Sequence, residues 1–310
     1  MSSRSSSSSL NLGEIDRIHP YYNDSEAEIA LRSSDGVLFK THSVLLKLAS
    51  DVFAGMVTIP QVQNQSETTE VVQLSEESDV ICALLDFIYP RRSPPKLHPF
   101  SFVLRLSEAA DKYDISDASH YIRERLTKTA ITISGSALEQ YALACRFGWI
   151  NEARYLSQFT TLPNTRDVAE RSILETLDAP SVVKLLNLHQ RRFSSISSLT
   201  ISYTSNNVVP ETRERQLHWE NLSYEHHLAC RSQAHDRNQL LVFKLFALSE
   251  MERVSSADCL SGFRPGFWSD SRLNGLWDEK CTKCSGKFFY KDSFAREFTR
   301  IMCLLPKNVD

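Results

Sequence analysis

Apolar and polar positions alternate over residues 28–40 and predict a β-hairpin near the start of the chain. Ile29 and Leu31 alternate with their neighbours, which is the period of a half-buried strand. The segment 34–36, Ser-Asp-Gly, supplies turn chemistry, because glycine tolerates a positive φ and aspartate can bond nearby backbone. Residues 37–40 then run back as the second strand.

Two short helices are predicted directly after this hairpin. Thr41 or Ser43 is the expected N-cap of the first helix, and Ser50 or Asp51 that of the second. The apolar residues at helical spacing are Val44, Leu45 and Leu48 in the first helix and Val52, Phe53 and Met56 in the second.

A third strand and two longer helices are predicted between residues 70 and 113. Residues 70–74, EVVQL, have the composition of a short strand. Ser78 or Asp79 can cap a helix whose apolar positions repeat through Ile88. The segment 91–99 is rich in proline and predicts a loop. The helix after it presents Phe102, Leu106, Ala109, Ala110 and Tyr113 on one side.

The pattern between residues 131 and 192 is entirely helical. Gly148 is a plausible C-terminal cap, Asn151 can cap the next helix, and Pro180 suits a first helical turn. His189 is one polar residue on an apolar helix face. We therefore expect a hydrogen-bonded packing residue at that position rather than a ligand.

Three further segments complete the predicted organisation of a chain of 310 residues, which is long enough for at least two domains. Residues 1–20 are dominated by serine and predict a disordered tail. Residues 193–209, rich in Ser, Thr and Asn, predict a linker. Residues 210–310 form a mostly helical C-terminal region of unassigned fold, with an amphipathic helix around residues 240–248.

Charge and apolar content narrow the class of protein. The net charge is −3, from 35 basic and 38 acidic residues, so no global field favours nucleic acid or a membrane surface. No apolar run is long enough to span a bilayer, and residues 2–9 lack the apolar core of a signal peptide. Seven scattered cysteines fit reduced thiols better than a disulfide framework. We expect an intracellular protein of the cytoplasm or nucleus.

The order of the predicted elements, together with several short motifs, resembles the BTB/POZ domain, a protein-interaction fold. The hairpin SDGVLFKTHSVLL is followed by SDVFAGM, with His42 at the family's histidine and the segment 51–53 at its Ser-x-Phe step. Residues 87–89, FIY, and 110–115, ADKYDI, also resemble the family pattern. Glu28 stands where the family usually has aspartate.

The resemblance implies an α+β fold. A small sheet flanked by α-helical hairpins is expected over residues 21–130, followed by an all-α, BACK-like extension over residues 131–192 and a mostly helical C-terminal region. The phrases YALACRFGWINEAR and SVVKLLNLHQRR resemble a large fungal, mushroom-type group of BTB proteins.

The function implied by the resemblance is that of a non-enzymatic scaffold or adaptor. Such domains bury an apolar face against a second copy, so a homodimer is expected. Phe53, Met56 and Ile59 are the candidate partner contacts. A substrate adaptor of a cullin-type ubiquitin ligase is the alternative, although residues 56–61 lack the Glu of the family's hydrophobic-x-Glu step.

Cys281 and Cys284 form a C-x-x-C motif, a spacing that can place two thiolates on one metal ion. A structural zinc would need two more ligands, for which Cys230 with His226 or His227 is the preferred pair. Plain reduced thiols are the other interpretation. A zinc-containing transcription-type regulator is accordingly a third function, although residues 210–310 are near charge balance. The sequence has no phosphate-binding glycine loop, nucleophile elbow or H-E-x-x-H motif, and we expect no enzymatic activity.

Overall fold

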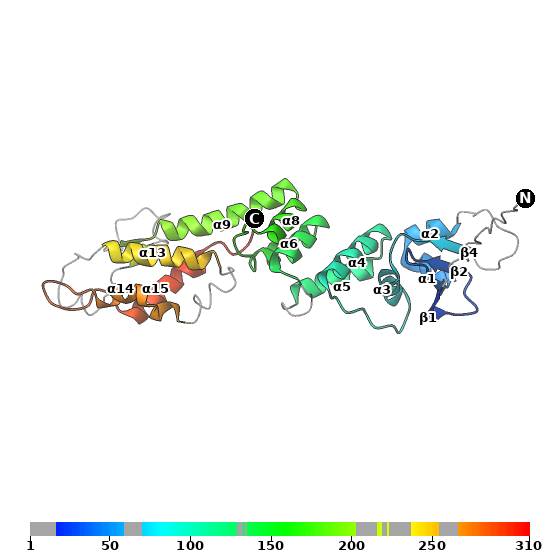
Figure 1. The fold of residues 1–310 in the computed structure, drawn as a ribbon, viewed down its shortest axis with the longest axis horizontal. Helices are drawn as coiled ribbons and strands as arrows, with labels where there is room; N and C mark the ends of the chain where they lie inside the picture. Colours follow the sequence, from blue (N-terminus) through cyan, green and yellow to red (C-terminus); the bar gives the residue numbers. More distant parts are fainter. Residues whose placement is uncertain are drawn as a thin grey trace, which may run out of the picture. The chain divides into compact units, whose positions relative to one another are not determined.

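The computed structural model describes residues 17–58, 70–128, 133, 135–202, 216–218, 222, 237–253 and 266–310. The chain divides into two compact units, Met1–Ser134 and Gly135–Asp310 (Figure 1). The first unit combines a small sheet with helices, and the described part of the second unit is mostly helical. The α+β class expected from the sequence is therefore confirmed.

A four-stranded mixed sheet forms one side of the first unit. Its strands are β1 (Arg17–Asn23), β2 (Ile29–Arg32), β3 (Val37–Thr41) and β4 (Glu70–Gln73), in the spatial order β1-β3-β2-β4. The β2–β3 pair is the predicted antiparallel hairpin. β4 pairs in parallel with β2, and β1 in parallel with β3.

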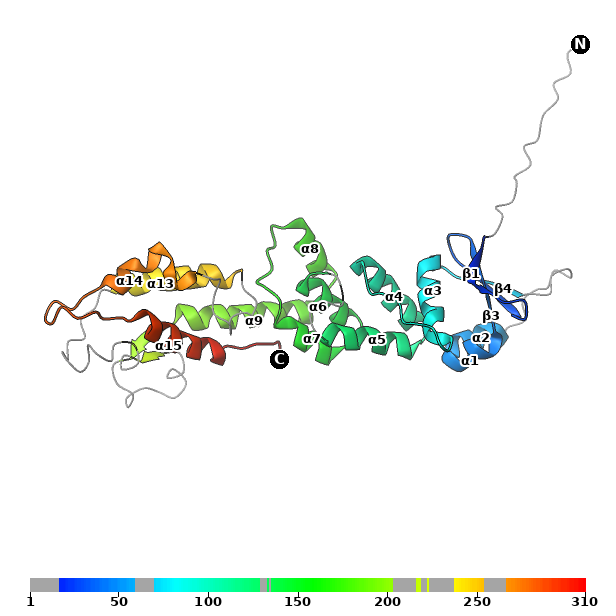
Figure 2. The same cartoon turned by 90° about the horizontal axis from the view of Figure 1, so that it is seen from below.

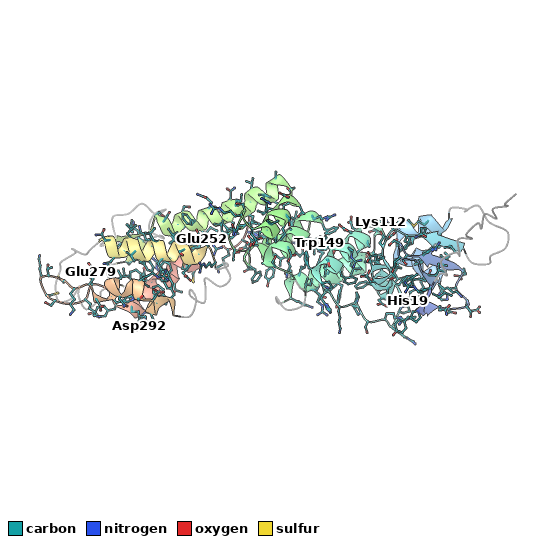
Figure 3. The ribbon with its side chains drawn as sticks, viewed as in Figure 1. His19, Lys112, Trp149, Glu252, Glu279 and Asp292 are labelled. Atoms are coloured by element: carbon teal, nitrogen blue, oxygen red, sulfur yellow. The ribbon has the colours of Figure 1, made fainter. Side chains whose placement is uncertain are left out.

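Strand β1 was not predicted, and it begins at Arg17, within the segment expected to be a disordered tail. Aromatic contacts attach this strand to the hairpin. The ring of His19 (Figure 3) stacks on that of Phe39 with centroids 4.7 Å apart, and Tyr22 is 2 % exposed. Tyr22 also donates a hydrogen bond to Asp86 at 2.8 Å. Most other residues of β1 are exposed, so the sequence shows no alternation of apolar and polar residues that would have predicted this strand.

Strand β2 is buried on both faces rather than half-buried. Ala30 is 4 % exposed and Leu31 is 1 % exposed, although their side chains point to opposite faces of the sheet. Side-chain burial at β2, which lies between β3 and β4, is therefore not confined to one face of the sheet.

The helices of the first unit are α1 (Ser43–Ala49), α2 (Asp51–Thr58), α3 (Ser78–Ile88), α4 (Phe100–Lys112) and α5 (Ser116–Thr127). α1 and α2 form a hairpin, while α3 packs against α4 and α4 against α5 (Figure 2). The sequence predicted the first four. α5 buries Ala118, Ile122 and Leu126 at four-residue spacing.

Carboxylates from the β-hairpin cap two of these helices. Glu28 accepts a hydrogen bond from the backbone N–H of Ser43 at 3.1 Å, and Asp35 accepts one from that of Ser78 at 2.9 Å. The predicted caps of α1 and α3 were therefore wrong, because groups distant in sequence satisfy these N–H groups. Ser50 caps α2 as predicted, accepting from the N–H of Phe53 at 3.0 Å.

The elements of the second unit are α6 (Ala137–Arg146), α7 (Ile150–Ser157), α8 (Val168–Glu175), α9 (Ala179–Ser197), β5 (Thr200–Ser202), β6 (Gln216–His218), α13 (Arg237–Met251), η2 (Phe267–Ser269), η3 (Ser271–Leu273), α14 (Asn274–Asp278) and α15 (Lys291–Leu304). Helix α9 continues to Ser197 and β5 follows, so the linker predicted over residues 193–209 is wrong in its first half. Trp149, rather than Asn151, occupies the N-cap position of α7. Gly148 has the positive φ, 66°, expected of a residue that ends a helix.

One apolar cluster joins the end of α9 to the C-terminal region. α13 packs against α9 and contributes Phe243, which makes edge-to-face contacts with Phe294 and Phe298 of α15. The helical extension and the C-terminal region therefore share one compact unit. In the part of the chain that the structure describes, every helix is too short or too polar to cross a membrane.

Candidate functional sites

The outer face of α1 presents two large apolar side chains to solvent. Val44 is 57 % exposed and Leu48 is 81 % exposed, and their four-residue spacing places them on one face of the helix. Leu46, by contrast, is fully buried. The predicted inward stripe of Val44, Leu45 and Leu48 was therefore wrong. In the sequence SVLLKLA most positions are apolar, so spacing alone does not fix the buried face.

The expected partner contact Phe53 lies in the core of the first unit. It is 2 % exposed, and its ring stacks on that of Tyr113. The hydroxyl of Ser50 donates a hydrogen bond to the carbonyl oxygen of Tyr113 at 2.5 Å, which fixes the junction between α1 and α2. Met56 is half-buried, and Ile59 lies outside the described residues. Phe53 is therefore a packing residue that holds α2 in place.

A polar cluster anchors the end of α4 beside the sheet. Glu76, just after β4, accepts hydrogen bonds from the Tyr113 hydroxyl at 2.5 Å and from Nζ of Lys112 at 2.7 Å. Lys112 is labelled in Figure 3. Burial by itself raises the pKa of the Glu76 carboxyl, but the bonds from Lys112, Tyr113 and Ser75 outweigh it and hold the pKa below its usual value. The A-D-K-Y-D segment thus ties α4 to the sheet.

Two other motif residues, His42 and Tyr89, bond each other. The backbone N–H of His42 donates to the Tyr89 hydroxyl at 2.9 Å, and its ring Nδ1 lies 3.1 Å from the same oxygen. Burial raises the pKa of Tyr89. This pair fastens the start of α1 to the end of α3. The motif residues of the first unit therefore hold the α1–α2 hairpin in place.

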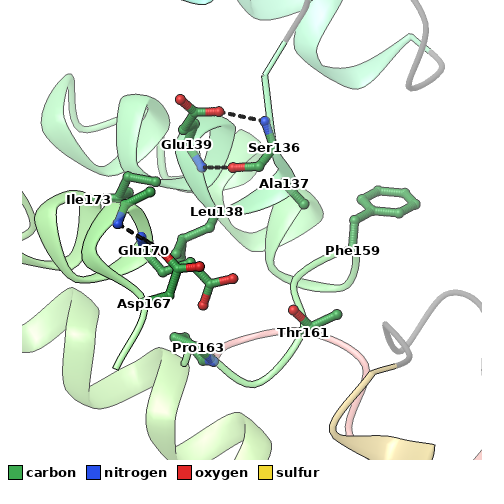
Figure 4. A pocket seen from close by; sticks show the side chains of 11 residues that line it. Ser136, Ala137, Leu138, Glu139, Phe159, Thr161, Pro163, Asp167, Glu170 and Ile173 are labelled. Atoms are coloured by element: carbon green, nitrogen blue, oxygen red, sulfur yellow. Dashed lines mark hydrogen bonds between the residues drawn. The ribbon is translucent and has the colours of Figure 1, made fainter. Parts of the chain in front are cut away.

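The second unit contains a pocket of about 480 Å³ between α6, the loop after α7, and α8 (Figure 4). Apolar groups of Leu138, Phe159, Pro163 and Ile173 line part of it. Helix α8 has no fully buried residue, so it covers the pocket without filling it. No sequence pattern predicted this pocket, because it depends on how loosely α8 packs.

Three carboxylates also line the pocket, and each caps a backbone N–H. Glu139 accepts from Ser136 at 2.6 Å, Asp167 from Ala169 at 2.8 Å, and Glu170 from Asn164 at 2.5 Å. No lysine or arginine is among the lining residues. Capping of backbone N–H groups gives each of the three carboxylates a structural role. Because no basic side chain lines the pocket, these carboxylates leave its wall negatively charged.

The C-x-x-C segment folds as a tight turn between α14 and α15. The backbone N–H of Lys283 donates to the Cys281 sulfur at 3.3 Å, and that of Ser285 donates to the Cys281 carbonyl at 2.9 Å. Lys280 and Lys287 pair as an antiparallel bridge on either side. Ser285 has a φ of 59°, which reverses the chain after the second cysteine.

The other predicted metal ligands, Cys230 and His226, lie outside the described residues. Within the described ranges, no cluster of three or more His, Cys, Asp or Glu side chains is arranged to hold a metal ion. His189 is buried, and its Nε2 lies 3.1 Å from Thr160 Oγ1. It is the hydrogen-bonded packing residue that the sequence indicated.

Comparison with known proteins identifies one part of the chain. The family model of the BTB/POZ domain matches residues 21–130, which contain the sheet from within β1 onward and helices α1 to α5. No curated protein matches the chain.

Proposed function

We propose that this chain, whose residues 21–130 form a BTB/POZ domain, is a non-enzymatic adaptor that self-associates through the outer face of α1. The domain is a protein-interaction module, and self-association is common in its family. The observation that carries the proposal is the exposure of Val44 and Leu48 on one face of a helix that is firmly anchored from behind.

The exposed apolar area of α1 favours association through this face. Leu48 is the most exposed large apolar side chain among the described residues. Full burial of a valine or leucine side chain is worth about 1.5–3 kcal/mol relative to leaving it exposed. In a two-fold symmetric dimer, both residues are contributed by each copy, so the same pair is buried twice.

Oligomeric mass tests this proposal directly. Light scattering on a size-exclusion column should give a dimer for the unaltered chain and a monomer for the variant V44D/L48D. The matched control is Leu245→Asp, because Leu245 is also exposed, at 60 %, but lies on α13 in the other unit. Circular dichroism checks that each variant is folded. A monomeric unaltered chain, or a dimer that survives V44D/L48D, contradicts the proposal.

A substrate adaptor of a cullin-type ligase is the alternative supported by the helices α6 to α9 that follow the domain. The missing Glu in residues 56–61 argues against it. Affinity purification of the tagged chain separates the two functions. Self-association without a copurified cullin removes the ligase alternative, and a stoichiometric cullin establishes it.

A further inference from the structure

We propose that the pocket between α6 and α8 is a docking site for a basic segment of a protein partner, in which an arginine or lysine stands next to an apolar residue. The pocket lies in the second compact unit, Gly135–Asp310, so the proposal goes beyond self-association through α1. It rests on the proposed adaptor role only in taking the occupant to be a protein.

The size and lining of the pocket fit a short peptide. Its volume of about 480 Å³ falls within the range of about 300–1,000 Å³ that is usual for ligand sites, which combine an apolar wall with a few polar groups. Leu138 and Pro163 contribute buried apolar groups, and Phe159 and Ile173 contribute half-buried ones. Part of the wall is therefore suited to an apolar side chain.

The three carboxylates of the pocket retain acceptor oxygens that their caps do not use. Asp167 accepts from backbone N–H groups through Oδ1 alone, and Glu139 and Glu170 accept through Oε2 alone. Among the described residues, the second oxygen of each carboxylate has no hydrogen-bond or ion-pair partner. An arginine or lysine of a partner can donate to these oxygens, and such charge-assisted bonds are about twice as strong as neutral ones.

The lining residues include no basic side chain that would neutralise this wall. Arg166 and Arg171 are the basic residues nearest to Asp167 in the sequence, but neither lines the pocket. Nε of Arg171 instead lies 3.9 Å from Oε1 of Glu175 on the same helix. The charge of the pocket therefore complements a basic occupant and repels an acidic one.

The arrangement of the lining favours a peptide over a small organic cation. Figure 4 shows the ring of Phe159 on one side of the pocket and the carboxylates of Asp167 and Glu170 on the other. A basic residue and an apolar neighbour in one peptide can contact both sides at once. Val168, which follows Asp167, is 68 % exposed, so a peptide that continues past the pocket finds further apolar surface on α8.

The test selects probe peptides from a random-peptide phage library on the full chain, after depletion of the library on the variant D167N/E170Q. This variant removes two charges, while asparagine and glutamine can still accept the capping bonds. The surviving peptides should be enriched in arginine or lysine beside an apolar residue. Fluorescence anisotropy should show that D167N/E170Q lowers their affinity at least tenfold.

The matched control is Glu175→Gln, because Glu175 belongs to the same helix but does not line the pocket. It should change the peptide affinity less than twofold. Glu139→Gln, which removes the charge on α6, is an independent second variant and should weaken binding at least threefold. Circular dichroism checks that each variant is folded. The variant V44D/L48D should bind the peptides with unchanged affinity, which separates this site from self-association.

Three outcomes overturn the proposal. No peptide survives the depletion, the survivors lack basic residues, or E175Q weakens their binding as much as D167N/E170Q does. Argininamide is the competitor that distinguishes a peptide from a small cation. If argininamide displaces the selected peptides at their own concentration, the pocket takes a small cation and the peptide is the wrong occupant.

Discussion

The ring of Phe53 in α2 lies parallel to the ring of Tyr113 at the end of α4, with centroids 4.7 Å apart and an interplanar angle of 7°. Both side chains are almost completely buried. Two short motifs separated by about sixty residues in the chain therefore meet in one contact. The two motifs therefore pack on each other in the core of the first unit.

Phe53→Ala should lower the free energy of unfolding of the first unit by about 3–5 kcal/mol, because it removes a buried ring and leaves a cavity against Tyr113. Met56→Ala should cost about 1 kcal/mol or less, since Met56 is only half-buried on the same helix. Hydrogen exchange of the α3 and α4 peptides measures both changes. A Phe53→Ala chain of unaltered stability that no longer dimerises would show that Phe53 contacts a partner after all.

Two glycines near each other in sequence should respond in opposite directions to alanine. Gly36, in the β-hairpin turn, has a φ of 79°, and a Cβ there would meet nothing within 4 Å. Gly36→Ala should therefore cost about 1 kcal/mol through backbone strain alone. Gly55, in α2, has the same open space but no positive φ, so Gly55→Ala should stabilise by up to about 1 kcal/mol.

The change in unfolding free energy caused by each glycine substitution is measured by the same hydrogen-exchange experiment on the first unit. If Gly36→Ala and Gly55→Ala shift the unfolding free energy in the same direction, the positive φ of Gly36 does not determine its role in the hairpin.

Secondary structure was predicted well from the sequence where side-chain periodicity and turn chemistry act locally. The β2–β3 hairpin, β4 and α1 to α4 all follow from residues close to one another in the chain. Helix caps were predicted less well, because the N–H groups of Ser43 and Ser78 bond to Glu28 and Asp35, which lie 15 and 43 residues earlier in the chain. Such long-range bonds leave no local pattern.

The buried faces of the helices and the functional surfaces were harder still to predict from the sequence. The orientation of α1 depends on which of its several apolar residues is buried in the core, and only the tertiary structure selects Leu46. The pocket beside α8 depends on imperfect packing, which composition does not encode. The C-x-x-C motif was visible in the sequence, whereas the N–H of Lys283 directed at Cys281 required coordinates.

His189 should make the second unit less stable as the pH falls below neutrality. Burial, together with the positive charge of Arg192, lowers the pKa of His189 from 6.5 to about 4. Below pH 6.5 the unfolded chain therefore binds a proton that the folded chain excludes, and stability falls until about pH 4. Between pH 7.5 and pH 5 the loss should be about 2 kcal/mol.

Tryptophan fluorescence during urea unfolding measures this effect, because all four tryptophans lie in the second unit. The control is His189→Gln, which can keep a hydrogen bond to Thr160 but does not titrate. Its stability should change less than that of the unaltered chain between the two pH values. Parallel pH profiles for the two proteins would contradict the assignment of this dependence to His189.

The tail after α15 should be held by one buried bond rather than by its ion pair. The backbone N–H of Val309 donates to Ser157 Oγ at 3.0 Å, and both residues are buried. Arg191 and Asp310 also form an ion pair at 2.7 Å, but both side chains are largely exposed. Exposed pairs contribute about 0–1 kcal/mol, whereas an unsatisfied buried group costs about 1–3 kcal/mol.

Ser157→Ala should therefore increase hydrogen exchange and proteolysis of residues 306–310 markedly, and Asp310→Asn should change them little. Salt separates the two contributions further, since screening weakens the exposed pair and leaves the buried bond intact. If Asp310→Asn releases the tail as strongly as Ser157→Ala, or if added salt alone releases it, the ion pair is the dominant contact. The expected order instead makes α7 the element that holds the tail in place.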